Sequence, residues 1–345
     1  MPANLTQQYL KAEEEYRRAT TLEEELACLQ VMLKEIPKHK GTDHLQADLK
    51  SKIANLKKDL VAEKSGKKGG RGLRIPRQGA GTAILLGGPN AGKSQLICSL
   101  TRATPEVAPY PFTTHAPTPA MMPFEDVTVQ LIDTPPVTKD FMDPHIHNLI
   151  RSADLVLLMI DLGSDDGIEQ CQEVLDRLNE TKTRLAAQSC LDENDVGLSY
   201  TRTFVVPNKI DLPEAAGRLE LFHELCPLDF PEYPISAAAG HPAHGTGQHI
   251  AGCRVAGLET LREAIYRSFD VIRVYSKLPT AKEPDRDRPF TVRRGSQLLD
   301  LAGQVHKDFL KGLKFARVWG EAVHDGTVVK GDYELHDKDI VELHM

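Results

Sequence analysis

Residues 83–94 read Ala-Ile-Leu-Leu-Gly-Gly-Pro-Asn-Ala-Gly-Lys-Ser, and they are the most informative stretch of the chain. An apolar run leads directly into the pattern G-x-x-x-x-G-K-S, and a helical stretch follows from Ser94 to about Leu100. A strand, a glycine-rich turn and a helix in this order form a phosphate-binding loop, because the glycines let successive backbone N–H groups turn toward a phosphate chain. The motif therefore predicts an α/β domain with a mostly parallel sheet and helices on both faces.

Each residue type in this loop has a distinct expected task. Lys93 supplies a positive charge to the outer phosphates, and Ser94 supplies a hydroxyl ligand for Mg²⁺. Backbone groups of the surrounding residues are expected to surround the phosphates. The further expected nucleotide contacts in the loop are Gly87, Pro89, Asn90, Ala91, Gly92 and Gln95.

A second motif identifies the base. Residues 205–211 read Val-Val-Pro-Asn-Lys-Ile-Asp, which is a buried strand ending in N-K-x-D. The Asp211 carboxylate can accept hydrogen bonds from N1–H and the exocyclic amine of guanine, whereas adenine offers neither pair, so the predicted ligand is GTP or GDP. A short apolar stretch then precedes a Ser-Ala pair, which would lie beneath the guanine O6. The residues expected at the base are Asn208, Lys209, Asp211, Ser236 and Ala237.

Two unusual residues lie where a GTPase would sense its γ-phosphate. The strand predicted at 127–132 is followed by Asp133-Thr134-Pro135-Pro136 in place of D-x-x-G. Asp133 fits the second-shell carboxylate of a Mg²⁺ site, but Pro136 has no backbone N–H to donate to a phosphate. Val137 then stands where Ras-type enzymes keep the glutamine that orients the attacking water. The sequence therefore predicts a second switch that responds weakly to GTP.

The order of these motifs resembles that of the Obg-like GTPases, and within them the developmentally regulated GTP-binding (DRG) branch. Residues 36–45 and 56–60 are similar to the helical hairpin and Gly/Lys stretch found there, and residues from about 289 resemble a TGS domain, a small β-grasp. The resemblance to GTPases with F-T-T at this place favours Thr114 over Thr113 as the threonine that the first switch presents to Mg²⁺ and the γ-phosphate. Pro136 departs from the family, which keeps a glycine.

This resemblance implies a Mg²⁺-dependent GTPase that hydrolyses GTP slowly and acts as a switch associated with RNA or ribosomes. Lys93 and Thr114 are then the expected catalytic residues, and Ser94, Thr114 and Asp133 the expected metal residues. Asn90 points to K⁺ as a second cation near the β- and γ-phosphates, in place of an arginine finger. The alternative function is a nucleotide-bound docking scaffold with little or no turnover, which Pro136 favours.

The expected domains follow from changes in pattern along the chain. Two helices with apolar stripes are predicted in residues 1–63: a capping box at 21–24 opens the first, Pro37 ends it, and the second starts near Asp43. Either the two stripes pair with each other in a hairpin, or they bind a protein partner as a coiled coil. The predicted domains are this hairpin at 1–63, a basic glycine-rich linker at 64–79, a GTP-binding domain at 80–280 and a TGS-like β-grasp at 289–345.

Three further segments have alternative interpretations. Residues 64–77 carry six positive charges, four glycines and no acidic residue, which is typical of a solvated linker or of a flexible RNA contact. The insertion at 240–256 has His and Cys residues of the types that bind zinc, but their spacing fits no established ligand pattern, so a glycine-rich surface loop is expected. Trp319 is expected in the core of the C-terminal domain rather than as a stacking platform for RNA.

Length and composition agree with a multidomain cytoplasmic protein. The 345 residues are enough for two or three domains, each with its own core. A net charge of −7 excludes a general polyanion-binding role for the whole chain, so any nucleic-acid surface must be local. The six cysteines form no C-x-x-C pair and are expected to be reduced. No apolar run approaches the roughly 20 residues of a membrane span, and the N-terminus does not resemble a signal peptide.

Overall fold

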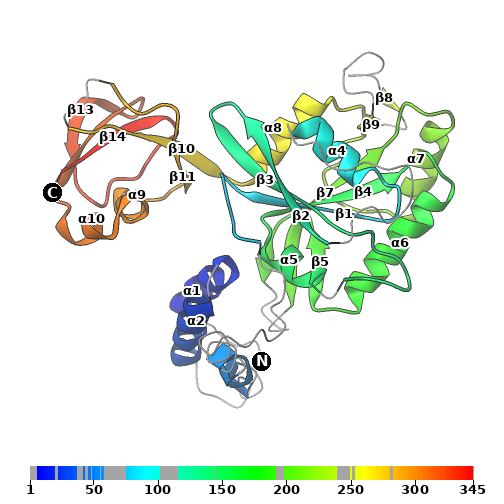
Figure 1. Ribbon diagram of the computed structural model, residues 1–345, viewed down its shortest axis with the longest axis horizontal. Helices are drawn as coiled ribbons and strands as arrows, with labels where there is room; N and C mark the ends of the chain where they lie inside the picture. Colours follow the sequence, from blue (N-terminus) through cyan, green and yellow to red (C-terminus); the bar gives the residue numbers. More distant parts are fainter. Residues whose placement is uncertain are drawn as a thin grey trace.

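The computed structural model describes three units: an N-terminal group of helices, an α/β domain and a smaller C-terminal sheet (Figure 1). None of the helices in the described part of the chain is long and apolar enough to cross a membrane. The described residues are 6–19, 22–36, 42, 46–47, 49–54, 56–57, 75–101, 116–143, 145–191, 198–238, 249–250, 253–279 and 283–344.

The α/β domain is built on a seven-stranded sheet in which six strands follow the order β2-β3-β1-β4-β7-β5. The sheet is parallel from β3 to β5, whereas β2 runs antiparallel to β3, and β6 pairs antiparallel with β7. All residues of β1 and β4 are buried, as expected for parallel strands that are covered on both faces. The strands are β1 (Thr82–Gly87), β2 (Thr118–Phe124), β3 (Val127–Asp133), β4 (Leu155–Asp161), β5 (Thr183–Ala186), β6 (Cys190–Leu191) and β7 (Ser199–Asn208).

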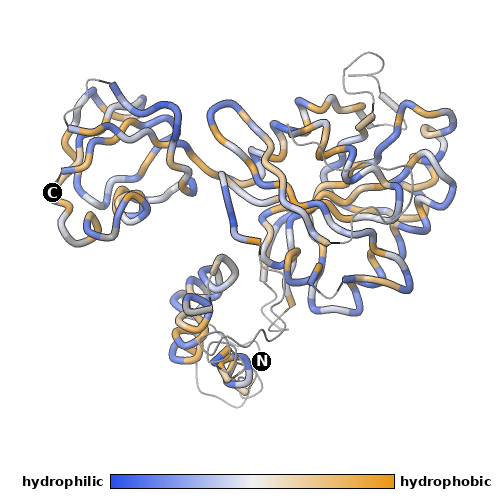
Figure 2. The backbone as a smooth tube through the Cα atoms, viewed as in Figure 1, coloured by the Kyte–Doolittle hydropathy of each residue, from blue (hydrophilic) through white to orange (hydrophobic). Residues whose placement is uncertain are grey.

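Helices cover both faces of this sheet, so the predicted fold class is confirmed. On one face, α4 (Lys93–Leu100) and α8 (Leu258–Ser268) bury Leu96 and Ile265 against the sheet. On the other face, α5 (Ile146–Ser152), α6 (Asp166–Asn179) and α7 (Ala215–Leu225) contribute residues such as Val174 and Phe222 to a second core cluster. Figure 2 shows the apolar residues concentrated in the strands between these two layers.

The parallel strands bring distant parts of the sequence to one edge of the sheet. Strand β1 lies between β3 and β4, with Ala83 opposite both Leu131 and Leu155. Because neighbouring parallel strands end at the same side, the loops after β1, β3, β4 and β7 meet there. Ligands of open α/β sheets bind in the crevice at these carboxyl ends.

A second sheet forms the C-terminal domain, with strand order β11-β10-β14-β12-β13. The helix α9 (Leu298–Val305) buries Leu298 and Leu301 in its core, and α10 (Lys307–Gly312) follows, which confirms the small β-grasp. The strands are β10 (Val271–Ser276), β11 (Phe290–Arg293), β12 (Phe315–Gly320), β13 (Val323–Val329) and β14 (Asp339–His344). Trp319 is only half-buried: Lys277 Nζ lies 4.4 Å from its ring centroid.

The boundary between these domains differs from the predicted one. Strand β10 pairs antiparallel with β11 and parallel with β14, so it belongs to the C-terminal sheet. The predicted GTP-binding domain, ending at residue 280, would include this strand. The sequence did not indicate the true border because β10 follows α8 with only Phe269 and Asp270 between them, and the composition does not change there. We therefore place the start of the C-terminal domain at residue 271.

The N-terminal group includes the two predicted helices and one additional helix. The predicted first helix is α2 (Leu22–Glu35), and residues 49–54 are helical within the predicted second one. Before them lies α1 (Gln7–Arg18), which packs the buried Tyr9 and Ala12 into the same cluster as Leu29. The apolar stripes therefore pack within this group, which agrees with the pairing alternative.

The insertion near residue 250 is described only in part. It contains the short pair β8 (His249–Ile250) and β9 (Cys253–Arg254). His241 and His244, part of the zinc-like spacing, lie outside the described residues. Within the described ranges, no group of three or more His, Cys, Asp or Glu side chains could hold a metal ion.

Candidate nucleotide-binding site

The loop between β1 and α4 has the backbone conformation that its glycines allow. Gly92 lies in the left-handed region with φ of 89°, directly before the first residue of α4. A Cβ atom at this position would lie 2.2 Å from the Asn208 side-chain nitrogen, so only glycine fits here. The loop is thus packed directly on the end of β7, 116 residues further along the chain (208 − 92).

Lys93 bends back over the loop that precedes it. Its Nζ donates to the backbone oxygens of Gly87 at 2.9 Å and Gly88 at 2.8 Å, and the side chain is buried. Burial lowers the pKa of Lys93 to about 8, although the nearby Asp133 carboxylate acts in the opposite direction. A phosphate chain beside this amine would supply the negative charge that favours its protonated form.

Ser94 and Asp133 bring two oxygen ligands together beside the loop. The Ser94 hydroxyl donates to Asp133 Oδ2 at 2.5 Å, and the Asp133 side chain is buried at the end of β3. Hydroxyl and carboxylate oxygens are the hard ligands that suit Mg²⁺, so this pair fits the metal that a nucleotide would carry. The next residue, Thr134, donates its hydroxyl to Leu85 O at 2.5 Å and fixes the chain after β3 to β1.

The two unusual residues after Thr134, Pro136 and Val137, are both buried. The N–H of Val137 donates to Gly87 O at 3.2 Å, and its side chain is fully buried among Ile84, Ile132 and their neighbours. The position predicted to lack the water-orienting glutamine is therefore a core position. The first N–H after Pro136 bonds to the phosphate loop's own backbone.

Asn208 joins the phosphate loop to the Ser-Ala segment that is predicted to contact a guanine. Its side-chain nitrogen donates to Ala91 O at 3.0 Å, and its side-chain oxygen accepts the N–H of Ala237 at 2.9 Å. Ser99 of α4 adds a second connection, because its hydroxyl donates to Ala237 O at 2.7 Å. The phosphate loop, the N-K-x-D segment and the Ser-Ala segment are thus braced as one unit. Ser99 belongs to none of the predicted motifs, since it lies in an ordinary helical stretch.

Lys209 and Asp211 follow Asn208 in the N-K-x-D segment. Lys209 forms an ion pair with Asp161 at the end of β4, with 2.7 Å between Nζ and Oδ2. Asp161 is buried and also accepts the N–H of Gly163, so it fixes the direction of the lysine. Asp211 is exposed and follows Ile210, whose N–H donates to Ile235 O. Asp161 is a second residue that the motifs did not predict, although a carboxylate at a strand end is a usable signal.

Some predicted residues are exposed or lie outside the described ranges. Asn90 is exposed at the tip of the loop, with a positive φ of 56°, and Pro89 and Gln95 are half-buried beside it. Thr113 and Thr114 both lie outside the described residues, as does most of the basic segment 64–77.

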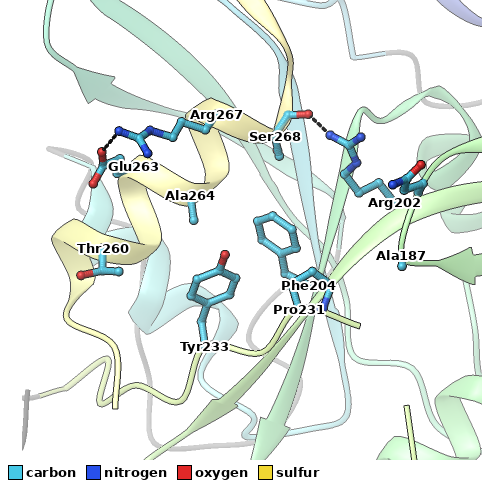
Figure 3. A pocket seen from close by; sticks show the side chains of 11 residues that line it. Ala187, Arg202, Phe204, Pro231, Tyr233, Thr260, Glu263, Ala264, Arg267 and Ser268 are labelled. Carbon is cyan, nitrogen blue, oxygen red and sulfur yellow. Dashed lines mark hydrogen bonds and ion pairs between the residues drawn. The ribbon is translucent and has the colours of Figure 1, made fainter. Parts of the chain in front are cut away.

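A separate cavity of about 460 Å³ lies near the other end of β7 (Figure 3). Arg202, Phe204 and Tyr233 line it on one side, and residues of α8 line it on the other. Arg202 donates to Ser268 O across it, and the Phe204 and Tyr233 rings lie 5.0 Å apart. None of the predicted nucleotide contacts lines this cavity, so it is distinct from the candidate site.

Two domain families match this chain. Residues 82–189 match the family described as 50S ribosome-binding GTPase, and residues 272–345 match the TGS domain. The chain is 25% identical to the developmentally regulated GTP-binding protein 1 of Xenopus laevis. This alignment covers 92% of the present chain and 97% of the Xenopus protein. The chain thus contains a GTPase domain followed by a TGS domain, and over most of its length it is similar to developmentally regulated GTP-binding proteins.

Archaeal proteins are also similar to this chain. A GTP-binding protein of Methanocaldococcus jannaschii is 27% identical over 93% of the chain and 92% of that protein. A crystal structure of a GTP-binding protein from Pyrococcus horikoshii is 17% identical, with a TM-score of 0.46, and covers 76% of this chain and 99% of its own. The match to the TGS domain begins at residue 272, in agreement with the domain start inferred from the pairing of β10.

Proposed function

We propose that this chain binds GTP with Mg²⁺ in the loop between β1 and α4 and hydrolyses it slowly to GDP and phosphate. The observation that carries this proposal is the Ser94–Asp133 contact of 2.5 Å beside the buried Lys93 amine. A charge for the phosphates and two oxygen ligands for the ion are thus assembled at one point. The bracing of this point to Asn208 supports guanine as the base.

Each residue of the proposed site then has a role. Lys93 exchanges the carbonyls of Gly87 and Gly88 for phosphate oxygens, and the loop N–H groups bind the rest of the chain. Ser94 and Asp133 hold the Mg²⁺ site, with Thr114 as a further ligand. When bound, the ion neutralises charge on the phosphates. Asp211 accepts the guanine N–H groups, while Asn90 is the candidate residue for K⁺. The remaining proposed contacts are Gly87, Pro89, Ala91, Gly92, Gln95, Lys209, Ser236 and Ala237.

Slow turnover is expected because a buried valine, Val137, stands where Ras-type enzymes keep the glutamine that orients the attacking water. That side chain is buried in the core, so it cannot be replaced by a polar function without a change in the fold. We expect an intrinsic rate at or below about 10⁻⁴ s⁻¹, as in unassisted Ras-type GTPases. A K⁺ ion or a partner would then be needed for faster turnover.

The second candidate function is a nucleotide-bound docking scaffold with little or no turnover. The hydrogen bond from Val137 N–H to Gly87 O favours it, because this bond holds the second switch segment against the loop without any γ-phosphate. A ligand can shift a conformational equilibrium only by its differential contacts with the two states. A segment fixed in this way would report little of the nucleotide state.

An association with RNA or ribosomes is the broader part of the proposal. It is supported by the match to the ribosome-binding GTPase family and by the basic residues of the segment 64–77. The test is co-sedimentation with ribosomes across a salt series. Replacement of Lys64, Lys67 and Lys68 by Gln should weaken the association, and more so at low salt, because fewer counterions are released. Unchanged co-sedimentation would contradict this part alone.

The central test is nucleotide binding followed by turnover. A fluorescent GDP analogue should be displaced by GTP and GDP but not by ATP. Turnover in K⁺ and in Na⁺, with and without ribosomes, separates the enzyme from the scaffold. Lys93→Ala should abolish binding or turnover and Ser94→Ala should remove the Mg²⁺ dependence, whereas Lys330→Ala, at an exposed lysine of the C-terminal domain, is the control. Full activity in both loop variants would refute the site.

A further inference from the structure

The turn between β2 and β3 is held by the C-terminal domain. Arg273 of β10 forms ion pairs with both residues of this turn, Glu125 and Asp126, and its guanidinium N–H groups donate to their carboxylates. The Arg273 side chain is only 7% exposed, and its partners Asp126 and Glu125 are 24% and 57% exposed. The pair with Asp126 is therefore better shielded from water than the pair with Glu125, and shielding strengthens a charge interaction.

We call the contacts of Arg273 with Glu125 and Asp126 the joint between the hairpin and the C-terminal domain, and two further residues take part in it. Asp337 accepts both the backbone N–H of Arg273 at 2.8 Å and its guanidinium at 2.9 Å, which orients the arginine toward the turn. Tyr275, two residues later on the same face of β10, donates its hydroxyl to Asp126. Burial would raise the pKa of Asp126, but hydrogen bonds from Tyr275 and Arg273 outweigh it and lower the pKa. Asp126 therefore stays ionised and bonded at neutral pH.

The hairpin is also fixed where it passes α8. The Phe124 ring stacks on Tyr266 with 4.6 Å between centroids, and Arg273 Cζ lies 5.8 Å from the Tyr266 ring centroid. Aromatic and cation–π contacts of this kind add to the area buried. The turn is thus held from two sides, by β10 and by α8.

The same hairpin leads directly to the candidate metal site. Its pairing runs without interruption from Phe124 opposite Val127 to Thr118 opposite Asp133. Asp133 is the carboxylate that accepts the Ser94 hydroxyl. Strand β2 begins just after the segment where the first switch threonine is predicted. A displacement of the turn along the strands would therefore be passed to both sides of the metal site.

We propose that Arg273 is a positioning residue of the nucleotide site, acting through the hairpin to fix Asp133. By thermodynamic reciprocity, occupation of the metal site then stabilises the contacts of Arg273, so the C-terminal domain and the nucleotide affect each other. This inference rests on the proposed binding of GTP and Mg²⁺. Arg273 belongs to the C-terminal domain and to none of the nucleotide-binding motifs, so the inference extends the proposed site beyond them.

The test uses two mild variants of the full-length chain. Asp126→Asn and Tyr275→Phe each weaken the joint, while Glu125 and Asp337 still pair with Arg273 and preserve the fold. The matched control is Arg294→Gln, which removes an ion pair with Asp270 whose side chains are 63% and 70% exposed. That pair is also near the domain border but does not touch the hairpin.

The first measurement is the dissociation rate of mant-GDP in Mg²⁺ and in EDTA. If the joint fixes Asp133, both variants should release the nucleotide about three- to tenfold faster in Mg²⁺ and at an unchanged rate in EDTA, where the metal site contributes nothing. The control should match the wild type in both. An equal acceleration in Mg²⁺ and EDTA would mean a purely structural role and would overturn the proposal.

The second measurement is hydrogen exchange of β10 and of residues 337–341. Addition of Mg²⁺ and a GTP analogue should slow exchange there in the wild type, and this effect should be smaller in Asp126→Asn. Wild-type protein that fails to bind mant-GDP would overturn the proposed function itself. Binding with normal affinity but identical behaviour of all variants would overturn only the role of Arg273.

Discussion

The N–H of Val137 donates to the backbone oxygen of Gly87 at 3.2 Å, and Lys93 Nζ donates to that same oxygen at 2.9 Å. One carbonyl thus joins the start of the phosphate loop to the segment that follows β3. In the proposed GTP complex, Lys93 leaves this oxygen for a phosphate, whereas Val137 has no reason to leave it. The second switch segment is therefore held in one place by contacts that do not depend on the γ-phosphate.

Replacement of Pro136 by Gly should make this segment more sensitive to GTP. The substitution introduces a backbone N–H at the position where related GTPases have one, so a GTP analogue gains a contact that GDP cannot make. Hydrogen exchange of residues 133–143 should then differ between the two nucleotides more strongly than in the wild type. We expect a cost of about 1 kcal/mol in the free energy of unfolding, from the added freedom of the unfolded chain.

The matched control for this change is Pro135→Gly. It adds similar freedom to the unfolded chain but leaves Pro136 in place, so the nucleotide dependence of exchange should stay as in the wild type. Strong protection of residues 133–143 by a GTP analogue but not by GDP in the wild-type protein would contradict the argument, since Pro136 would then be no obstacle.

The local motifs predicted which segments lie together because each combines a strand end with a loop of fixed geometry. Gly92 and Asn208 illustrate this: the N-K-x-D asparagine and the last loop glycine lie in contact, as two strands ending at the same edge require. The burial of Val137 could not be predicted, because a single apolar residue after two prolines has no periodicity. The contacts of Arg273 could not be predicted either, since they depend on how two domains pack. The helix α1 was not predicted as a separate helix, because its sequence is rich in charged residues.

Replacement of Asp211 by Asn should change the base preference. The amide donates where the carboxylate accepts two hydrogen bonds, so affinity for GDP should fall roughly 100-fold or more, and xanthine nucleotides should be favoured. Displacement of a fluorescent nucleotide by GDP and by xanthosine diphosphate measures both effects. Asp165→Asn, at a carboxylate on the surface that pairs with Arg218, should leave both affinities unchanged. Equal affinity of wild-type protein for ATP and GTP would show that Asn208 and Asp211 do not read the base.

Replacement of Gly92 by Ala should destabilise the fold and impair nucleotide binding together. The new Cβ would require a left-handed conformation and would lie 2.2 Å from the Asn208 side chain, so we expect a loss of roughly 2 kcal/mol or more in unfolding free energy. Gly217→Ala in α7 is the opposite case, because no atom lies within 4 Å of its Cβ position. That variant should gain about 0.5–1 kcal/mol. Urea unfolding of both proteins checks the pair, and equal stability would contradict the close packing of the loop on β7.

The pKa of Lys93, lowered to about 8 by burial, gives pH effects of opposite sign on binding and on stability. Between pH 8 and about 10.4 the unfolded chain holds this proton and the folded free protein does not, so stability should rise with pH through this group. Nucleotide binding requires the charged amine and must take the proton up again, so affinity for GDP should fall as pH rises above 8, by about tenfold per unit at the limit. Calorimetry in two buffers of different ionisation enthalpy measures the proton uptake, and urea unfolding of wild type and Lys93→Met between pH 7 and 9 measures the stability effect. Binding without proton uptake at pH 8.5, or a wild type whose stability relative to Lys93→Met does not rise between pH 7 and 9, would show that the Lys93 amine is already charged in the free protein.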